Sequence, residues 1–181
     1  FQVVVGIEGK ASLALVAYTI AFGIILIAGL LLIILGYDIL ENSAVAILST
    51  LIPLGLSTGL VVEYFPSLAT PYLIFVILGF IFVVASRLLA PGKAASILLM
   101  IVHGVSGLLI FGLPVYLSLK GQAPSSFILV GVGGGLIGIA GLLLSFLKAG
   151  HPLLSRERIL QLLPIVLVLT TTAFVAGFWR V

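Results

Sequence analysis

The chain has 181 residues, of which 62% are hydrophobic and only 7% are charged, and its formal net charge is +3. Soluble domains carry about 25% charged residues, so this composition excludes a water-covered surface and indicates a protein surrounded by membrane lipid, while eight scattered Lys and Arg residues give no basic stripe for nucleic acid. The absence of cysteine excludes disulfides and thiolate metal sites, and a single Met and a single Asn are what a thermophilic protein would also show.

Six long apolar segments follow one another along the chain. A helix needs about 20 residues to cross the hydrocarbon core of a bilayer, and each segment is long enough. We therefore expect an all-α integral membrane protein with six transmembrane helices, forming a single transmembrane domain over residues 1–181. The expected spans are about 11–37, 43–65, 69–90, 94–118, 125–147 and 156–179, and residues 1–10 are expected to form an interfacial lead-in.

Capping and turn-forming residues separate these spans. Asn42 or Ser43 can cap the second span with a side-chain oxygen, and Ser155 can cap the sixth. Pro53 lies inside the second span and predicts a kink there. Short polar turns after the first, third and fifth spans fit three helical hairpins.

The fifth span is the richest in glycine. In lipid such a segment stays helical because no water is present to bond an open backbone, and strips of small residues let helices approach closely. We expect the other helices to pack around this span. The expected packing residues are Gly131, Gly134, Gly135, Gly138 and Gly141 in the fifth span, with Gly55 and Gly59 in the second.

Positive charges are divided unevenly between the two sides of the membrane. The loops after the first, third and fifth spans hold Arg87, Lys93, Lys148, Arg156 and Arg158, whereas the opposite side holds Lys10, Lys120 and Arg180. Cytoplasmic loops carry the excess of Lys and Arg in membrane proteins. The distribution therefore predicts odd-numbered loops in the cytoplasm of the cell and both termini outside.

His103 is the ionisable residue nearest the middle of a span, where a charge is costly to bury. We interpret it as a neutral histidine that is hydrogen-bonded to a neighbouring carbonyl or hydroxyl group. The alternative roles are an axial ligand of haem or a proton relay, although the sequence offers no second haem ligand. His151 lies in a loop beside Pro152 and is interpreted as a solvated residue. No other cofactor is expected.

The segment Gly104-Val-Ser106-Gly107 resembles the Gly-x-Ser-Gly motif of rhomboid intramembrane proteases, which also have six core helices and place the serine on the fourth. The resemblance covers four residues and implies a nucleophile at Ser106. The sixth span lacks the histidine base of that family, and the second span lacks its His/Asn pattern. His103 lies on the same helix as Ser106, which is not the family's dyad. We therefore expect no enzyme and interpret Ser106 as a small packing residue.

The remaining charged residues near the spans have structural interpretations. Glu63 and Arg87 lie near span ends, from which long side chains reach the interface. Asp38 and Glu41 supply only two carboxylates, and the sequence adds no partner ligands, so we expect no metal site there.

The sequence favours a non-catalytic accessory or structural subunit of a larger membrane complex, such as a respiratory or other energy-converting one. Its spans offer few charges, cofactor ligands or catalytic groups, and its glycine face suits helices of other subunits or of a second copy. The alternative is a small transporter or channel, or the membrane substrate-binding component of a transporter. A helix broken at Gly133-Gly134-Gly135, or a polar cavity near those glycines, Thr170–Thr172 and His103, would favour that alternative.

Overall fold

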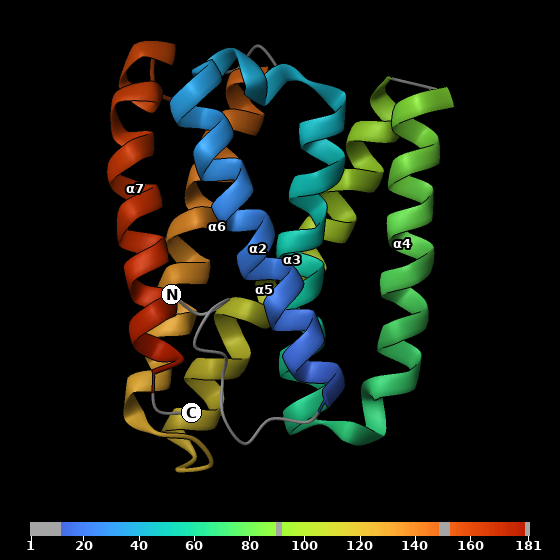
Figure 1. Cartoon of the computed structure of the whole chain (residues 1–181), viewed down its shortest axis with the longest axis vertical. Helices are drawn as coiled ribbons and strands as arrows, with labels where there is room; N and C mark the ends of the chain where they lie inside the picture. Colours follow the sequence, from blue (N-terminus) through green and yellow to red (C-terminus); the bar gives the residue numbers. More distant parts are fainter. Residues whose placement is uncertain (1–11, 90–91, 149–152, 180–181) are drawn as a thin grey trace. The chain divides into compact units, whose positions relative to one another are not determined.

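The computed structural model of the chain describes residues 12–89, 92–148 and 153–179, all in helices and the turns between them (Figure 1). The lead-in expected over residues 1–10, as well as His151 and Arg180, lies outside the described residues. The long helices are α2 (Ser12–Leu35), α3 (Ser43–Tyr64), α4 (Ala69–Leu89), α5 (Lys93–Leu119), α6 (Ile128–Lys148) and α7 (Arg156–Gly177). Three short 3-10 helices, η1 (Tyr37–Glu41), η2 (Pro66–Leu68) and η3 (Ser125–Phe127), precede α3, α4 and α6.

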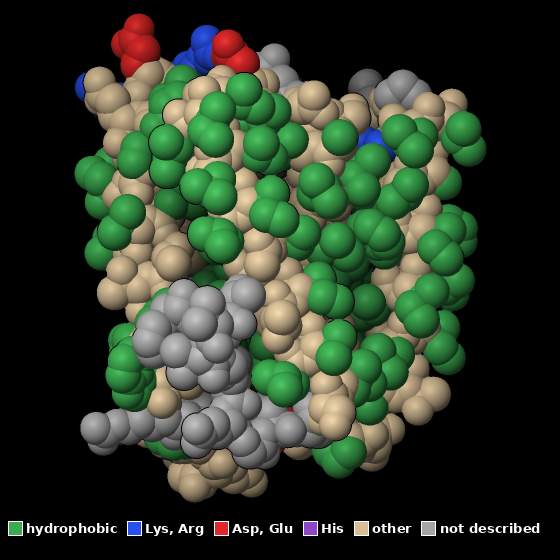
Figure 2. Space-filling view, in the orientation of Figure 1, with side chains coloured by type: hydrophobic (Ala, Val, Ile, Leu, Met, Phe, Trp, Pro, Cys, Tyr) green, Lys and Arg blue, Asp and Glu red, His purple; other side chains and the backbone are tan. Residues whose placement is uncertain are grey.

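Each expected span coincides with one of these helices, and the bounds differ by three residues at most. All six helices are long and apolar enough to cross a membrane. Figure 2 shows hydrophobic side chains spread over the visible faces of the helices, as expected for surfaces that meet lipid. The prediction of an all-α protein with six transmembrane helices is confirmed, and the chain is a polytopic membrane protein.

The ends of the helices follow from local chemistry. The Asn42 side chain accepts a hydrogen bond from the backbone N–H of Ala44 at 2.8 Å and so caps α3. Ser155 caps α7 in the same way, through the backbone N–H of Arg158 at 3.3 Å. Gly36 ends α2 with φ +70°, a conformation that side chains with a Cβ rarely adopt.

The described residues form two compact units that divide inside α5, between Leu109 and Ile110. The first unit contains α2, α3, α4 and the first part of α5. The second unit contains the rest of α5 with α6 and α7.

In the first unit, α3 packs against both α2 and α4. Leu54 of α3, Val83 of α4 and Val102 of α5 form a buried cluster at its core. Half of the α3 span is buried (50%), compared with 33% for the glycine-rich span of α6. In the first unit the other helices therefore pack around α3, whereas in the second unit the glycine-rich span contacts both α5 and α7. Small residues in α3 let neighbouring helices approach it closely.

In the second unit α6 lies beside α7 (Figure 1). The ring of Phe127, which precedes α6, packs edge-on against the ring of Phe178, which follows α7, with centroids 5.6 Å apart. Gly177 lies so close to α6 that an added Cβ would be 2.8 Å from the backbone nitrogen of Val130. The α6–α7 pair is therefore fastened at this end by an aromatic contact and a close backbone approach.

Candidate functional site

The hydroxyl groups of Ser57, Tyr72 and Ser106 meet inside the first unit. Tyr72, in the first turn of α4, donates a hydrogen bond to Ser57 Oγ of α3 at 2.7 Å, and its oxygen lies 3.4 Å from Ser106 Oγ of α5. Both serines have no exposed surface (0%). A buried tyrosine hydroxyl needs a polar partner, and here the partners come from two other helices. We call Ser57, Tyr72 and Ser106 the hydroxyl chain.

The hydroxyl chain ends on the backbone of α3. Ser57 Oγ lies 2.5 Å from the carbonyl oxygen of Pro53 and 3.2 Å from that of Leu54, and it has one hydrogen to donate to them. The single hydrogen of the Tyr72 hydroxyl goes to Ser57, so in the contact between Tyr72 and Ser106 the serine is the donor. The donors therefore follow one direction, from Ser106 on α5 through Tyr72 on α4 to Ser57 and the backbone of α3. The arrangement satisfies the polar groups and joins three helices.

His103 lies in the same unit, one turn from Ser106 on α5. Its Nδ1 is 3.2 Å from the carbonyl oxygen of Leu99, one turn earlier in its own helix. Since a carbonyl accepts, Nδ1 carries a hydrogen in this contact, and in a neutral ring Nε2 then holds the lone pair. In the motif that resembles rhomboid proteases, the recorded side-chain partner of Ser106 is Tyr72, and that of His103 is the carbonyl of Leu99. Among the described residues, no hydrogen bond between Ser106 and a histidine base is recorded.

The two glycines singled out in α3 lie against α2. A Cβ at Gly55 would be 2.7 Å from the carbonyl oxygen of Ala17 and 3.0 Å from the Cβ of Ala21. A Cβ at Gly59 would overlap the ring of Tyr18, which is itself buried. Real Cβ atoms do not approach other atoms so closely, so these positions require glycine if α2 and α3 are to touch here.

The glycines of α6 divide into two groups. Added Cβ atoms at Gly131 and Gly134 would come within 2.7 Å of Phe111 O and 2.8 Å of Ile110 Cγ2 on α5. Gly135 faces α5 as well, through the ring of Phe111, whereas Gly133 meets the ring of Phe174 on α7. Apart from the adjacent backbone of α6, no described atom of the second unit lies within 4 Å of a Cβ built at Gly138 or Gly141.

The alternative of a helix broken at Gly133-Gly134-Gly135 is not supported, because α6 runs as one helix from Ile128 to Lys148. The close contacts of these glycines with α5 and α7 explain their presence without an unwound backbone.

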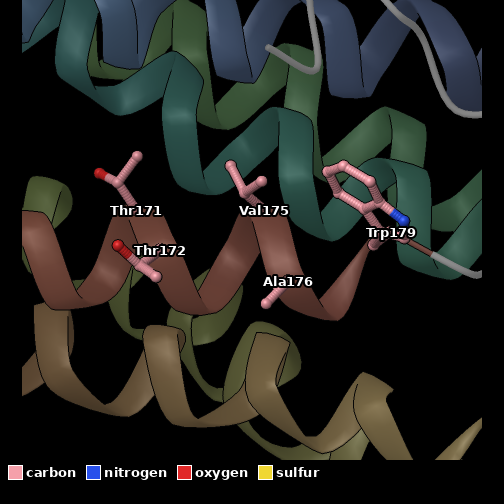
Figure 3. Close-up of a pocket in the computed structure, with 5 residues that line it drawn as sticks. All are labelled: Thr171, Thr172, Val175, Ala176 and Trp179. Atoms are coloured by element: carbon pink, nitrogen blue, oxygen red, sulfur yellow. The ribbon is translucent and has the colours of Figure 1, made fainter.

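A hollow lies along one face of α7 in the second unit. Its volume is about 380 Å³. Figure 3 shows that all its lining side chains come from α7 and the turn after it. The Thr171 hydroxyl donates to the carbonyl oxygen of Leu167 at 2.8 Å and is therefore already bonded within its helix. The lining residues are Thr171, Thr172, Val175, Ala176 and Trp179.

The other polar residues singled out in the sequence are not among those that line this hollow. Thr170 is buried, and its hydroxyl has no hydrogen-bond partner among the described residues. Arg87 is half-buried near the end of α4, and its Nε likewise has no hydrogen-bond partner in the part of the chain described. Asp38 lies exposed in η1 and Glu63 half-buried at the end of α3. The described residues contain no group of three potential metal ligands.

Sequence reasoning missed Ser57 and Tyr72. One signal was present, because a tyrosine in the first turns of a membrane span has a hydroxyl that must find a partner. Its two partners are 15 and 34 residues away along the chain, so the sequence did not identify them.

No known protein family, curated protein or solved structure matches this chain.

Proposed function

We propose that the protein is a non-catalytic subunit of a larger membrane complex, and that other transmembrane helices pack on glycine-containing faces which its own helices leave open. The observation that carries this proposal is the division of the α6 glycines. Gly131, Gly134 and Gly135 face α5, whereas a Cβ built at Gly138, one turn further along, would meet no neighbouring atom of the second unit within 4 Å. A strip of small residues brings a lipid-facing helix no advantage, but it allows a second helix to approach closely.

A second open face lies on α5. Apart from the adjacent backbone of α5, no described atom of the first unit lies within 4 Å of a Cβ added at Gly104 or Gly107, and large apolar side chains are exposed beside them on the helix. The exposed side chains include Met100, Ile101, Val105 and Leu108. Apolar side chains beside small ones are what a partner helix needs for close packing in lipid.

The test is the mass and composition of the particle after gentle extraction from its native membrane. We expect the chain to migrate with other subunits, and the variant Gly138→Leu to lose them because a large side chain separates the helices. Gly29→Leu is the matched control, since a Cβ at Gly29 on α2 also meets no described atom of its unit, and no other glycine lies within one turn of it. Unchanged co-migration of Gly138→Leu, or a particle that contains this chain alone as a monomer, would refute the proposal.

A small transporter or channel is the second candidate, and the hydroxyl chain is the observation that favours it. Polar groups buried in a membrane domain often mark a substrate path, and Ser57, Tyr72 and Ser106 bring three of them together between helices. The test is flux of ions and small polar solutes into vesicles that contain the purified protein. Flux that Tyr72→Phe and Ser106→Ala reduce would support this candidate, and impermeable vesicles would remove it.

A further inference from the structure

The middle of α3 combines several features that weaken a helix. Pro53 has no backbone N–H, so the carbonyl of Ser49 loses its usual partner, and the ring of proline favours a bend. The hydroxyl of Thr50 donates to the carbonyl of Ala46 at 2.9 Å, and Ser57 donates to Pro53. Such bonds from a side chain to the preceding turn also bend helices. All these features lie within three turns of the same helix.

The two parts of α3 on either side of Pro53 differ in their packing. From Leu54 to Val61, every residue except Gly55 is buried, and the contacts with α2, α4 and α5 are made here. Over residues 43–53, Thr50 alone is buried. The second part of α3 is therefore buried in the core, whereas the first part is largely half-buried or exposed.

Ser57 has two alternative acceptors one residue apart. Its Oγ lies 2.5 Å from the carbonyl oxygen of Pro53 and 3.2 Å from that of Leu54. Ser57 has a single hydrogen, so it can bond well to one acceptor at a time, and its bond to Pro53 competes with the backbone hydrogen bonding of the turn after Pro53. Tyr72 approaches from α4 and donates to the same oxygen at 2.7 Å, which fixes where Ser57 Oγ can lie.

We propose that α3 pivots at Pro53 and that Tyr72 is the latch which sets its bend, by holding the Ser57 hydroxyl against the Pro53 carbonyl. When the latch is closed, the first part of α3 keeps one orientation relative to α4. When Tyr72 releases Ser57, the serine hydroxyl donates instead to the carbonyl of Leu54, and the first part of α3 takes up a second orientation. Ser106, at the longer distance of 3.4 Å, is the alternative partner of the released Tyr72 hydroxyl.

The absence of cysteine makes this device directly measurable, because introduced cysteines are then the only labelling sites. The reporter pair is Leu48→Cys on α3, before Pro53, with Ile81→Cys on α4; both side chains are exposed. Spin labels at the two positions give the distribution of distances between α3 and α4 in lipid. The control pair is Ile81→Cys with Ile101→Cys, which joins α4 to α5 and omits α3.

We expect one distance population for the reporter pair in the otherwise unchanged chain and a second population in Tyr72→Phe, with the control pair unchanged in both. Ser57→Ala should reproduce the second population, because it removes the hydroxyl that the latch holds. Adding Pro53→Ala to Tyr72→Phe should restore a single population, because the pivot is then removed.

An unchanged distribution in Tyr72→Phe or in Ser57→Ala would overturn the latch, and so would an equal change in the control pair. Ser57→Ala decides the matter if Tyr72→Phe does not fold. A second population that survives Pro53→Ala would overturn the pivot. None of these outcomes depends on whether the protein is a subunit or a transporter, so this proposal and the proposed function fail separately.

Discussion

Tyr18 of α2 lies with its ring against the bare backbone of Gly59 in α3, and a Cβ at residue 59 would overlap three atoms of that ring. The ring is 1% exposed and cannot move aside into lipid. Gly55, one turn earlier, meets the backbone of α2 itself. Close contact between α2 and α3 therefore depends on the absence of side-chain atoms at two successive turns of α3.

Gly59→Ala should destabilise the first unit. Overpacking a well-packed site costs about 1–3 kcal/mol, because rings and backbone must shift to make room. The check is the midpoint of thermal unfolding in detergent, with Gly23→Ala as the control, since a Cβ at Gly23 meets no described atom. Combining Gly59→Ala with Tyr18→Ala should lose less than the sum of the two single variants, and strict additivity would contradict the contact.

Gly134→Leu should disrupt the folded chain itself, and not only its association with partners. A Cβ at Gly134 would lie 2.8 Å from Ile110 Cγ2 and 3.2 Å from the backbone of Phe111, so a leucine would force α5 and α6 apart. We expect aggregation or a lower unfolding midpoint in size-exclusion and thermal assays. Gly138→Leu should keep the unfolding midpoint of the isolated chain. Equal stability of the two variants would count against the division of the α6 glycines.

His103→Ala should leave the fold nearly unchanged. The one hydrogen bond recorded for its ring goes to Leu99 in the same helix, so its removal separates no helices. A typical hydrogen bond contributes about 0.5–1.5 kcal/mol net, and this one competes with nothing across an interface. The measurements are thermal unfolding and visible absorption of the native particle. Loss of a haem band in His103→Ala would show instead that Nε2 binds a cofactor.

Trp179 should report the depth of the end of α7. It is the single tryptophan of the chain and is 60% exposed, so its fluorescence has one source and is open to quenchers. Tryptophan prefers the boundary between headgroups and acyl chains. Bromine attached to lipid chains near the headgroups should therefore quench the emission more than bromine near the chain ends. Stronger quenching from the bilayer centre would place this end of α7 inside the hydrocarbon core.

The six helices were predictable because length and apolarity suffice to identify a membrane span. The cap at Asn42 was predictable as well, since a short side-chain oxygen before an apolar run has few other uses. The spacing of Gly55 and Gly59 indicated a packing face, but it did not name Tyr18 as the side chain that occupies it.

The hydroxyl chain was not predictable in the same way. Hydrophobic periodicity is weak in spans that are apolar all round, so the sequence does not tell which way Tyr72 faces. Its pairing with Ser57 depends on the rotation of α4 about its own axis, which packing alone sets. For the same reason, Gly134 and Gly138 look alike in the sequence, although the first meets α5 and the second meets no described atom.

The two carbonyl acceptors that Ser57 finds in its own helix have a consequence for biosynthesis. Chain order delivers α2 to the membrane before α3, and α4 and α5 after it, so the glycine face of α3 can find its partner at once while Ser57 must wait for Tyr72 and Ser106. During that interval an unbonded hydroxyl in lipid would be costly. The carbonyls of Pro53 and Leu54 accept its hydrogen in the meantime. The nascent helix therefore carries a polar group that is harmless to insertion and still able to recruit the helices made later.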